Sequence, residues 1–147
     1  MLIDLQSGGT KSNHTGASIA LDNDASDVEL EAAARHSPGA VVTIAFPKFN
    51  DGRGFSIARL LRDRYRFHGE IRAVGNVIPD QATHLLRAGF DTVELPDGSA
   101  TAVWQSALTR YSGVYQTAFR NPQRMRHTFT VTPHPHADAT ALPTQRA

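Results

Sequence analysis

The segment that decides the fold is Phe46-Pro47-Lys48-Phe49-Asn50-Asp51-Gly52-Arg53-Gly54-Phe55-Ser56, in which glycines and charged residues follow an apolar run. The run itself, residues 41–46 (VVTIAF), is rich in β-branched residues and predicts a buried strand. Residues 56–65 then carry apolar side chains at helical spacing and predict a helix: Ile57, Leu60, Leu61 and Tyr65. The segment is therefore predicted to be the turn of a strand–turn–helix unit.

The same alternation continues along the chain. Residues 71–75 and 92–95 are typical of strands, and the helix between them is predicted to begin at Pro79 and to end at Gly89. Strands that alternate with helices indicate an α/β fold. We expect a small parallel sheet of three or four strands with right-handed βαβ crossovers, either half-barrel or flavodoxin-like. The open edges of such a sheet are compatible with a homo-oligomer.

Shorter signals flank this unit. Ile19 and Leu21 predict a short edge strand. Ser26 and Glu29 have the spacing of a capping box, which predicts the start of a helix that ends near residue 36. A last helix is predicted from four residues that share one face: Trp104, Ala107, Leu108 and Tyr111.

These signals divide the chain into three parts. Residues 1–17 are mostly polar and predict a flexible N-terminal arm. Residues 18–119 are predicted to form a single α/β domain. Residues 120–147 are basic and contain several prolines, which is typical of a disordered tail.

Composition excludes several classes of function. The net charge of +1 over 147 residues predicts neither nucleic acid nor a membrane as partner, although residues 48–72 hold seven Lys or Arg against three Asp or Glu. The chain has no cysteine, so it cannot use a thiol nucleophile, a disulfide or a thiolate-held iron–sulfur cluster. It also lacks an apolar run of membrane-spanning length and a secretory signal pattern, so we expect a cytoplasmic location.

Candidate binding residues gather where the predicted strands end. In α/β sheets ligands bind at the carboxyl ends of parallel strands, and polar residues follow two of these strands here. Lys48 and Arg53, with amides at the start of the next helix, are predicted to hold a small anion. The full set of candidates for this site is Lys48, Asp51, Arg53, Ser56, Arg72, Asp80 and Gln81.

The two glycines of the turn have a simpler interpretation than nucleotide binding. Gly52 and Gly54 begin a pattern like the dinucleotide fingerprint, but Ile57 stands where its third glycine would be. The glycines are explained as well by a tight turn between strand and helix.

Three of the charged candidates also have structural interpretations. Asp51 would cap the helix that follows it, and Asp80 would complement the dipole of the next one. Arg72 lies inside a strand, where a guanidinium needs a partner. Glu70, Asp51 or Glu94 would serve, so Arg72 is either part of a structural ion pair or an electrophilic group aimed into the site.

The sequence identifies no catalytic residue and no cofactor. Lys48 would form a Schiff base only if desolvated, and Ser56 has no nucleophile-elbow context. His134 and His136 have the spacing of a metal pair but no third ligand nearby, so no metal site is predicted.

Residues 46–56, followed by Ala58-Arg59-Leu60-Leu61-Arg62, resemble a bacterial family of unknown function. Its members are described as probable oxidoreductases involved in sulfite reduction, encoded beside sulfite reductase in sulfate-assimilation operons. The resemblance continues through residues 69–75, 80–81, 89–91 and 115–116. It implies a role in assimilatory sulfur metabolism but carries over no catalytic residue. Asn76 and Pro79 depart from the family pattern, which has an acid and a more polar residue there.

Three hypotheses of function follow. The leading one is an accessory protein of assimilatory sulfite reduction that binds a small anion or a partner at the carboxyl ends of the strands. The second is a small enzyme that acts on a phosphorylated or sulfonated molecule, with Lys48 and arginines neutralising the developing charge. The third is a non-catalytic interaction module for sulfite reductase or another sulfate-assimilation enzyme. That module would bind through a helix face that carries Arg59, Arg62 and Arg66.

Overall fold

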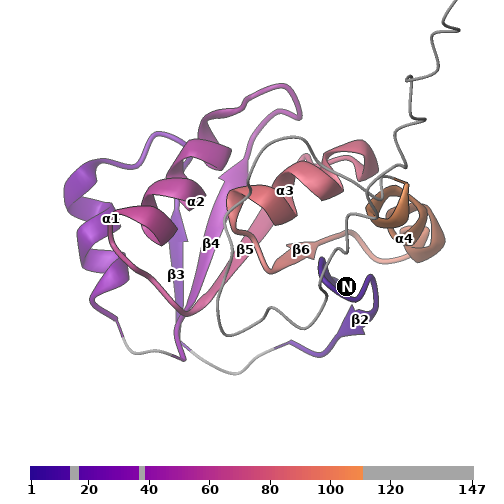
Figure 1. Ribbon diagram of the computed structural model, residues 1–147, viewed down its shortest axis with the longest axis horizontal. Coiled ribbons are helices and arrows are strands. Elements are labelled where there is room, and N and C mark those ends of the chain that lie inside the picture. Colours follow the sequence, from indigo (N-terminus) through magenta and orange to yellow (C-terminus); the bar gives the residue numbers. More distant parts are fainter. Residues whose placement is uncertain (14–16, 37–38, 111–147) are drawn as a thin grey trace, which may run out of the picture.

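The computed structural model describes residues 1–13, 17–36 and 39–110 (Figure 1). In this part of the chain one sheet of six strands has the order β2-β1-β6-β5-β4-β3. The strands are β1 (Leu2–Asp4), β2 (Thr10–Lys11), β3 (Ser18–Leu21), β4 (Val41–Phe46), β5 (Glu70–Gly75) and β6 (Thr92–Glu94). The helices are α1 (Asp27–Ala34), α2 (Arg53–Asp63), the 3-10 helix η1 (Pro79–Gln81), α3 (Ala82–Ala88) and α4 (Thr101–Thr109).

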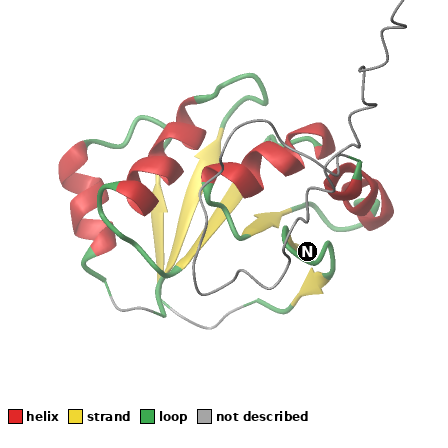
Figure 2. Cartoon of the chain, viewed as in Figure 1, coloured by secondary structure: helices red, strands yellow, loops and turns green. Residues whose placement is uncertain are grey.

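The four strands β3 to β6 are parallel and lie side by side in sequence order. Right-handed crossovers that always step in the same direction place their helices on the same face of a sheet. Accordingly, α1, α2 and α3 lie together on one side of the strands (Figures 1 and 2). The predicted α/β class and crossovers are confirmed. The unbroken strand order agrees with the half-barrel alternative, since a flavodoxin-like sheet reverses its order.

Two predictions about the amino end were wrong. The sheet has more strands than expected, and the segment predicted as a flexible arm contributes β1 and β2 to it. β1 pairs antiparallel with β6, and its Ile3 is fully buried, as is Leu5 just beyond it. Burial of these apolar side chains fixes the segment, while the polar residues between them and β2 form only the turn.

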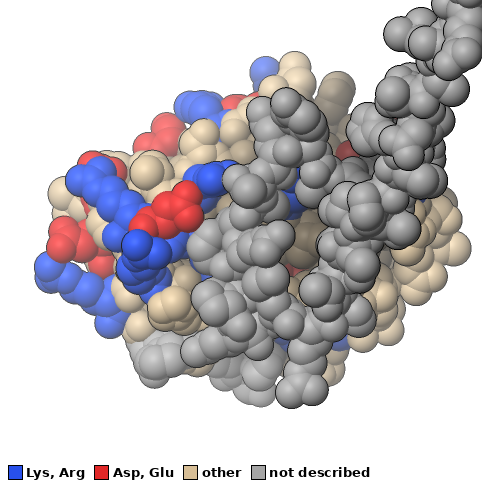
Figure 3. All heavy atoms as spheres, viewed as in Figure 1, with Lys and Arg blue, Asp and Glu red and all other residues tan. Residues whose placement is uncertain are grey.

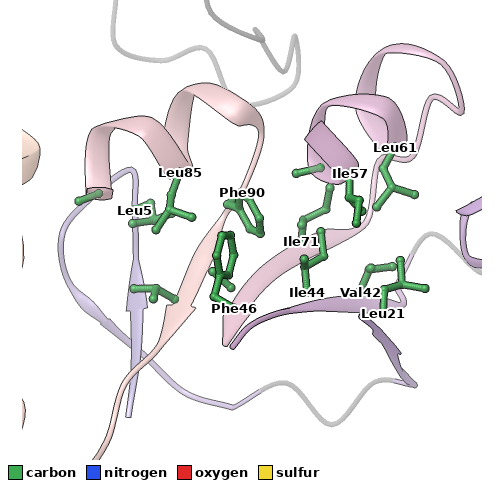
Figure 4. Close-up of a cluster of buried hydrophobic side chains, with 14 of the residues drawn as sticks. Leu5, Leu21, Val42, Ile44, Phe46, Ile57, Leu61, Ile71, Leu85 and Phe90 are labelled. Atoms are coloured by element: carbon green, nitrogen blue, oxygen red, sulfur yellow. The ribbon is translucent and has the colours of Figure 1, made fainter. Parts of the chain in front are cut away.

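The core lies between the sheet and its helices. Side chains from alternate positions of β4 and β5 point at α2 and α3, as Figure 4 shows for Ile44, Phe46 and Ile71. The ring of Phe46 packs against those of Phe55 and Phe90, at centroid distances of 5.3 and 5.8 Å. This aromatic group joins the end of β4 to the two helices beside it.

Helix ends follow the predicted local chemistry. The backbone N–H of Ser26 donates to the Glu29 carboxylate at 2.7 Å, which confirms the capping box before α1. Gly89 ends α3 with a φ of 109°, and the N–H of Phe90 donates to the carbonyl of Leu85. That left-handed residue explains why glycine stands there.

Helix α2 begins earlier and faces the core differently from the prediction. Leu60 is 37% exposed, whereas the buried positions are Gly54, Ile57, Ala58, Leu61 and Arg62. The buried face of α2 is therefore rotated about the helix axis relative to the predicted one. Arg62 lies on this buried face, and Leu60 lies at its edge.

Some predictions fall on other parts of the chain. Those for residues 120–147 and for Tyr111 lie outside the described residues. Over the residues that are described, no helix has the length and apolar character needed to cross a membrane.

Candidate functional site

The loops that follow β3, β4 and β5 lie together at one end of the sheet, and we call them the carboxyl rim. Asn23, after β3, donates from its side-chain amide to the Asp51 carboxylate at 2.6 Å. Asn76, after β5, donates to the carbonyl of Pro47 at 2.7 Å. The loop after β4 is thus fixed on both sides, as expected for neighbouring parallel strands.

Asp51 occupies the position that the sequence assigned to an external anion. Its carboxylate accepts hydrogen bonds from the Arg53 guanidinium at 3.0 and 2.8 Å and from the Arg53 backbone N–H at 3.2 Å. Hydrogen bonds from the side chain and backbone of Arg53 lower the pKa of the Asp51 carboxyl to about 2. The N-cap of α2 is Gly52 and not Asp51, but the Asp51 carboxylate, one residue earlier, bonds to the first N–H of the helix and neutralises Arg53.

Gln81 is used inside the rim. Its amide donates to the carbonyl of Phe49 at 2.6 Å and accepts from the N–H of Ile78 at 3.2 Å. Gln81 was predicted to bind a ligand at the rim. It does lie at the rim. Both ends of its amide instead bridge two loops of the protein.

The remaining rim candidates are exposed. Lys48 and Ser56 project from the loop and from the first turn of α2, and among the described residues Lys48 has no ion-pair partner. Asp80 is 72% exposed in its side chain and pairs with Arg110 at 3.1 Å. These side chains are exposed at the predicted end of the sheet.

Two apolar side chains of the rim were missed by the sequence reasoning. Phe49 is 55% exposed and Ile78 is 38% exposed. Their backbones bond to opposite ends of the same Gln81 amide, so the two residues come from adjoining loops. We call Lys48, Phe49, Arg53 and Ile78 the rim surface. The signal in the sequence was an aromatic residue in the middle of an otherwise polar turn.

Arg72 does not belong to this surface, which corrects the predicted site. It lies in β5 three residues before the strand ends, about 10 Å from the rim. Its guanidinium bonds to Glu70 at 3.0 Å and to Asn13 at 2.9 Å and lies 4.0 Å from Glu94. The structural ion pair is thus confirmed with Glu70 and Glu94, and Asp51 is not a partner.

Glu70 is the centre of a buried polar network at the amino end of β5. Its carboxylate also accepts from Lys11 at 2.8 Å and from the Thr92 hydroxyl at 2.7 Å. Burial raises the pKa of the Glu70 carboxyl, but hydrogen bonds from Lys11, Thr92 and Arg72 outweigh this effect and hold the pKa at about 2. The network connects β2 and the residues after it to the middle of the sheet.

The predicted arginine face for partner binding is not assembled. Arg62 is 2% exposed, and its guanidinium bonds to Asp91 at 2.7 Å and to the carbonyls of Phe67 and Gly69 at 2.8 Å. Arg59 is exposed and pairs with Asp63 one turn later. Lys and Arg side chains over α1 and α2 are interleaved with acids (Figure 3). Arg66 is exposed beyond the end of α2, so the three predicted arginines do not share one helix face.

Within residues 1–13, 17–36 and 39–110, no group of three or more His, Asp or Glu side chains has an arrangement that could hold a metal ion. His134 and His136 lie outside these ranges.

Comparison with protein families gave one match. The model of a family described as bacterial protein of unknown function (DUF934) matches residues 18–126, which is 109 of the 147 residues. The match begins at β3, after β1 and β2. Neither the curated proteins nor the solved structures gave a match.

Proposed function

The chain belongs to the DUF934 family of bacterial proteins of unknown function, and we propose that it is an accessory protein of assimilatory sulfite reduction. In this proposal the rim surface binds a partner protein, and sulfite reductase is that partner. The protein itself carries out no chemistry.

The observation that carries the proposal is the pair of exposed apolar side chains, Phe49 and Ile78, on a rim held by internal hydrogen bonds. An isolated exposed apolar residue is ordinary, but two on adjoining loops that are bonded together favour an interface. Aromatic residues are typical of the centres of protein–protein interfaces, and charged residues of their edges. Phe49 is such an aromatic residue, and the exposed Lys48 next to it in the loop would lie at the edge.

The same geometry makes the two other uses of the rim less favourable. A small anion would compete with the Asp51 carboxylate, which already bonds to Arg53 in two places. A catalytic lysine needs a lowered pKa from burial, whereas Lys48 is exposed. An internally bonded surface with exposed apolar side chains suits a protein partner better than either.

The sulfur pathway enters through the resemblance of residues 46–62 to proteins encoded beside sulfite reductase. A product of a neighbouring gene that presents a binding surface is reasonably a partner of the enzyme itself. This argument selects sulfite reductase as the first protein to test.

The test is binding of the purified full chain to the sulfite reductase encoded in the same genome. We expect Phe49→Asp to weaken binding about 30-fold or more, because a charge would replace an interface anchor worth about 2 kcal/mol. Val103→Asp is the matched control, since Val103 is a 49% exposed apolar residue on α4 and is not part of the rim surface. Affinities are measured by calorimetry or surface plasmon resonance.

Equal affinity of the Phe49→Asp and Val103→Asp proteins would contradict the proposal. If Arg59→Glu combined with Arg66→Glu abolished binding instead, the partner would bind the helix side of the molecule. Arg62 is left unchanged in that variant because its burial would confound binding with unfolding.

A further inference from the structure

The rim surface is made by two separate loops, and one side chain joins them at the tip. Phe49 follows β4, and Ile78 follows β5. Gln81 donates to the carbonyl of Phe49 at 2.6 Å and accepts from the N–H of Ile78 at 3.2 Å. The amide side chain can do both. An ionised carboxylate has no hydrogen-bond donor, and a thioether has no donor and is only a weak acceptor.

Gln81 is itself anchored to the core. It precedes α3 directly, and the first residue of α3, Ala82, is fully buried. Asn76 holds the base of the β4 loop through the carbonyls of Phe46 and Pro47, at 2.8 and 2.7 Å. The loop is therefore fixed at its base by Asn76 and near its tip by Gln81.

We propose that Gln81 is a positioning residue for partner binding, which sets the spacing of Phe49 and Ile78 so that both contact the partner together. The inference depends on the proposed function, because it concerns the same surface. Gln81 need not touch the partner. Its contribution is to order two loops before binding, so that less conformational entropy is lost in the complex.

A fixed spacing has a thermodynamic signature. Two contacts held in one geometry act as a unit, so truncating either weakens the contribution of the other. When the loops move independently, each contact is made or lost alone. Coupling between Phe49 and Ile78 should therefore exist with Gln81 present and disappear without it.

The binding experiment uses Gln81→Met, which keeps the length of the side chain and removes its donor and acceptor. Gln105→Met is the matched control, because Gln105 on α4 makes a similar bond, from its amide to the carbonyl of Gly8 at 3.0 Å. We expect Gln81→Met to weaken binding to sulfite reductase about tenfold, and Gln105→Met to leave it unchanged. The cost of Phe49→Ala should also fall when Gln81→Met is present.

A second measurement needs no partner. The N–H of Ile78 donates to Gln81, so its hydrogen exchange, followed by NMR in the full chain, should become faster in Gln81→Met and not in Gln105→Met. Thermal unfolding of both variants checks that any change is local.

The outcomes separate the two proposals. If Phe49→Asp binds like the wild type, the proposed function fails, and the positioning role fails with it. If Phe49→Asp loses binding while Gln81→Met binds normally, only the positioning role is overturned. Unchanged exchange at Ile78 in Gln81→Met would overturn it as well.

Discussion

Glu70 is a carboxylate that the fold keeps ionised in a buried place. Its side chain is 7% exposed, and three different side chains donate hydrogen bonds to it. Burial alone would favour the neutral acid, so the donors decide its state. The protonation of this one group should therefore be visible in the stability of the whole protein.

The pKa of Glu70 predicts how stability changes in acid. Because the folded pKa is about 2 and the ordinary value is 4.5, the stabilisation is complete above pH 4.5 and is lost as the pH falls toward 2. Between pH 6 and pH 3 the wild type should lose about 2 kcal/mol more than Glu70→Gln. Urea unfolding at both pH values measures this. Equal losses of stability in the two proteins would show that the pKa of Glu70 is not lowered by folding. The pH-dependent contribution of Asp51 cancels in this comparison, because both proteins contain Asp51.

Arg62 gives the second prediction at this scale. Arg62→Met should reduce the free energy of unfolding by about 3–5 kcal/mol, because it removes the guanidinium that pairs with buried Asp91. Arg59→Met, three residues away on the same helix, should change it by less than about 0.5 kcal/mol, since that pair is exposed. Chemical denaturation compares the two. Similar values for both would mean that the buried pair has no special role.

At the level of the element, Gly54 allows the first turn of α2 to pack closely on β4. A Cβ added there would lie 2.7 Å from the ring of Phe46, which is 1% exposed and cannot move away. At Gly52, by contrast, an added Cβ would meet nothing within 4 Å. Gly52 would tolerate a side chain, and Gly54 permits close packing of the helix on the strand. Packing therefore accounts for Gly54 without a bound phosphate.

These glycines make a matched pair of substitutions. Gly54→Ala should destabilise the protein by about 1–3 kcal/mol, because the helix or the ring must shift. Gly52→Ala should stay within about 1 kcal/mol of the wild type, since its φ of −83° suits alanine. Thermal unfolding distinguishes them, and the reverse order would contradict this account of the turn.

Most elements could be predicted because their signals are local. The apolar run of β4, the capping box of Ser26 and the glycine stop of α3 each depend on neighbouring residues. Burial of Arg62 could not be predicted, because its partner Asp91 is 29 residues away in sequence. Leu60 also appeared to belong to the apolar stripe, and only the packing of α2 on the sheet shows that it is half exposed.

At the scale of the whole molecule, the main structure that the sequence did not predict is the edge of the sheet formed by β1 and β2. β1 has three residues, too few for a clear period of two, and its partner β6 is 88 residues later in the chain, counted from Asp4 to Thr92. The meeting of the loops after β3, β4 and β5 could be predicted, because parallel strands necessarily bring their carboxyl ends to one edge of the sheet. The sequence pattern could not predict the hydrogen-bond partners of Arg72 and Gln81, which both bond to other parts of the protein.

The buried position of β1 gives a prediction for the whole fold. Ile3→Ala should cost about 2–5 kcal/mol, because Ile3 is fully buried in the common core. Val28→Ala, at a position 76% exposed on α1, should cost less than about 0.5 kcal/mol. Equilibrium unfolding measures both. A small effect at Ile3 would mean that β1 is only loosely attached.

The two ends of the parallel strands carry different kinds of side chain. Arg62 with Asp91, and Glu70 with Lys11, lie where the strands begin, whereas Phe49 and Ile78 lie where they finish. Side chains at the finishing end can therefore be exchanged without removing a buried ion pair. By the same reasoning, a double variant with Phe49→Ser and Ile78→Ser should melt close to the wild-type temperature, whatever it does to partner binding.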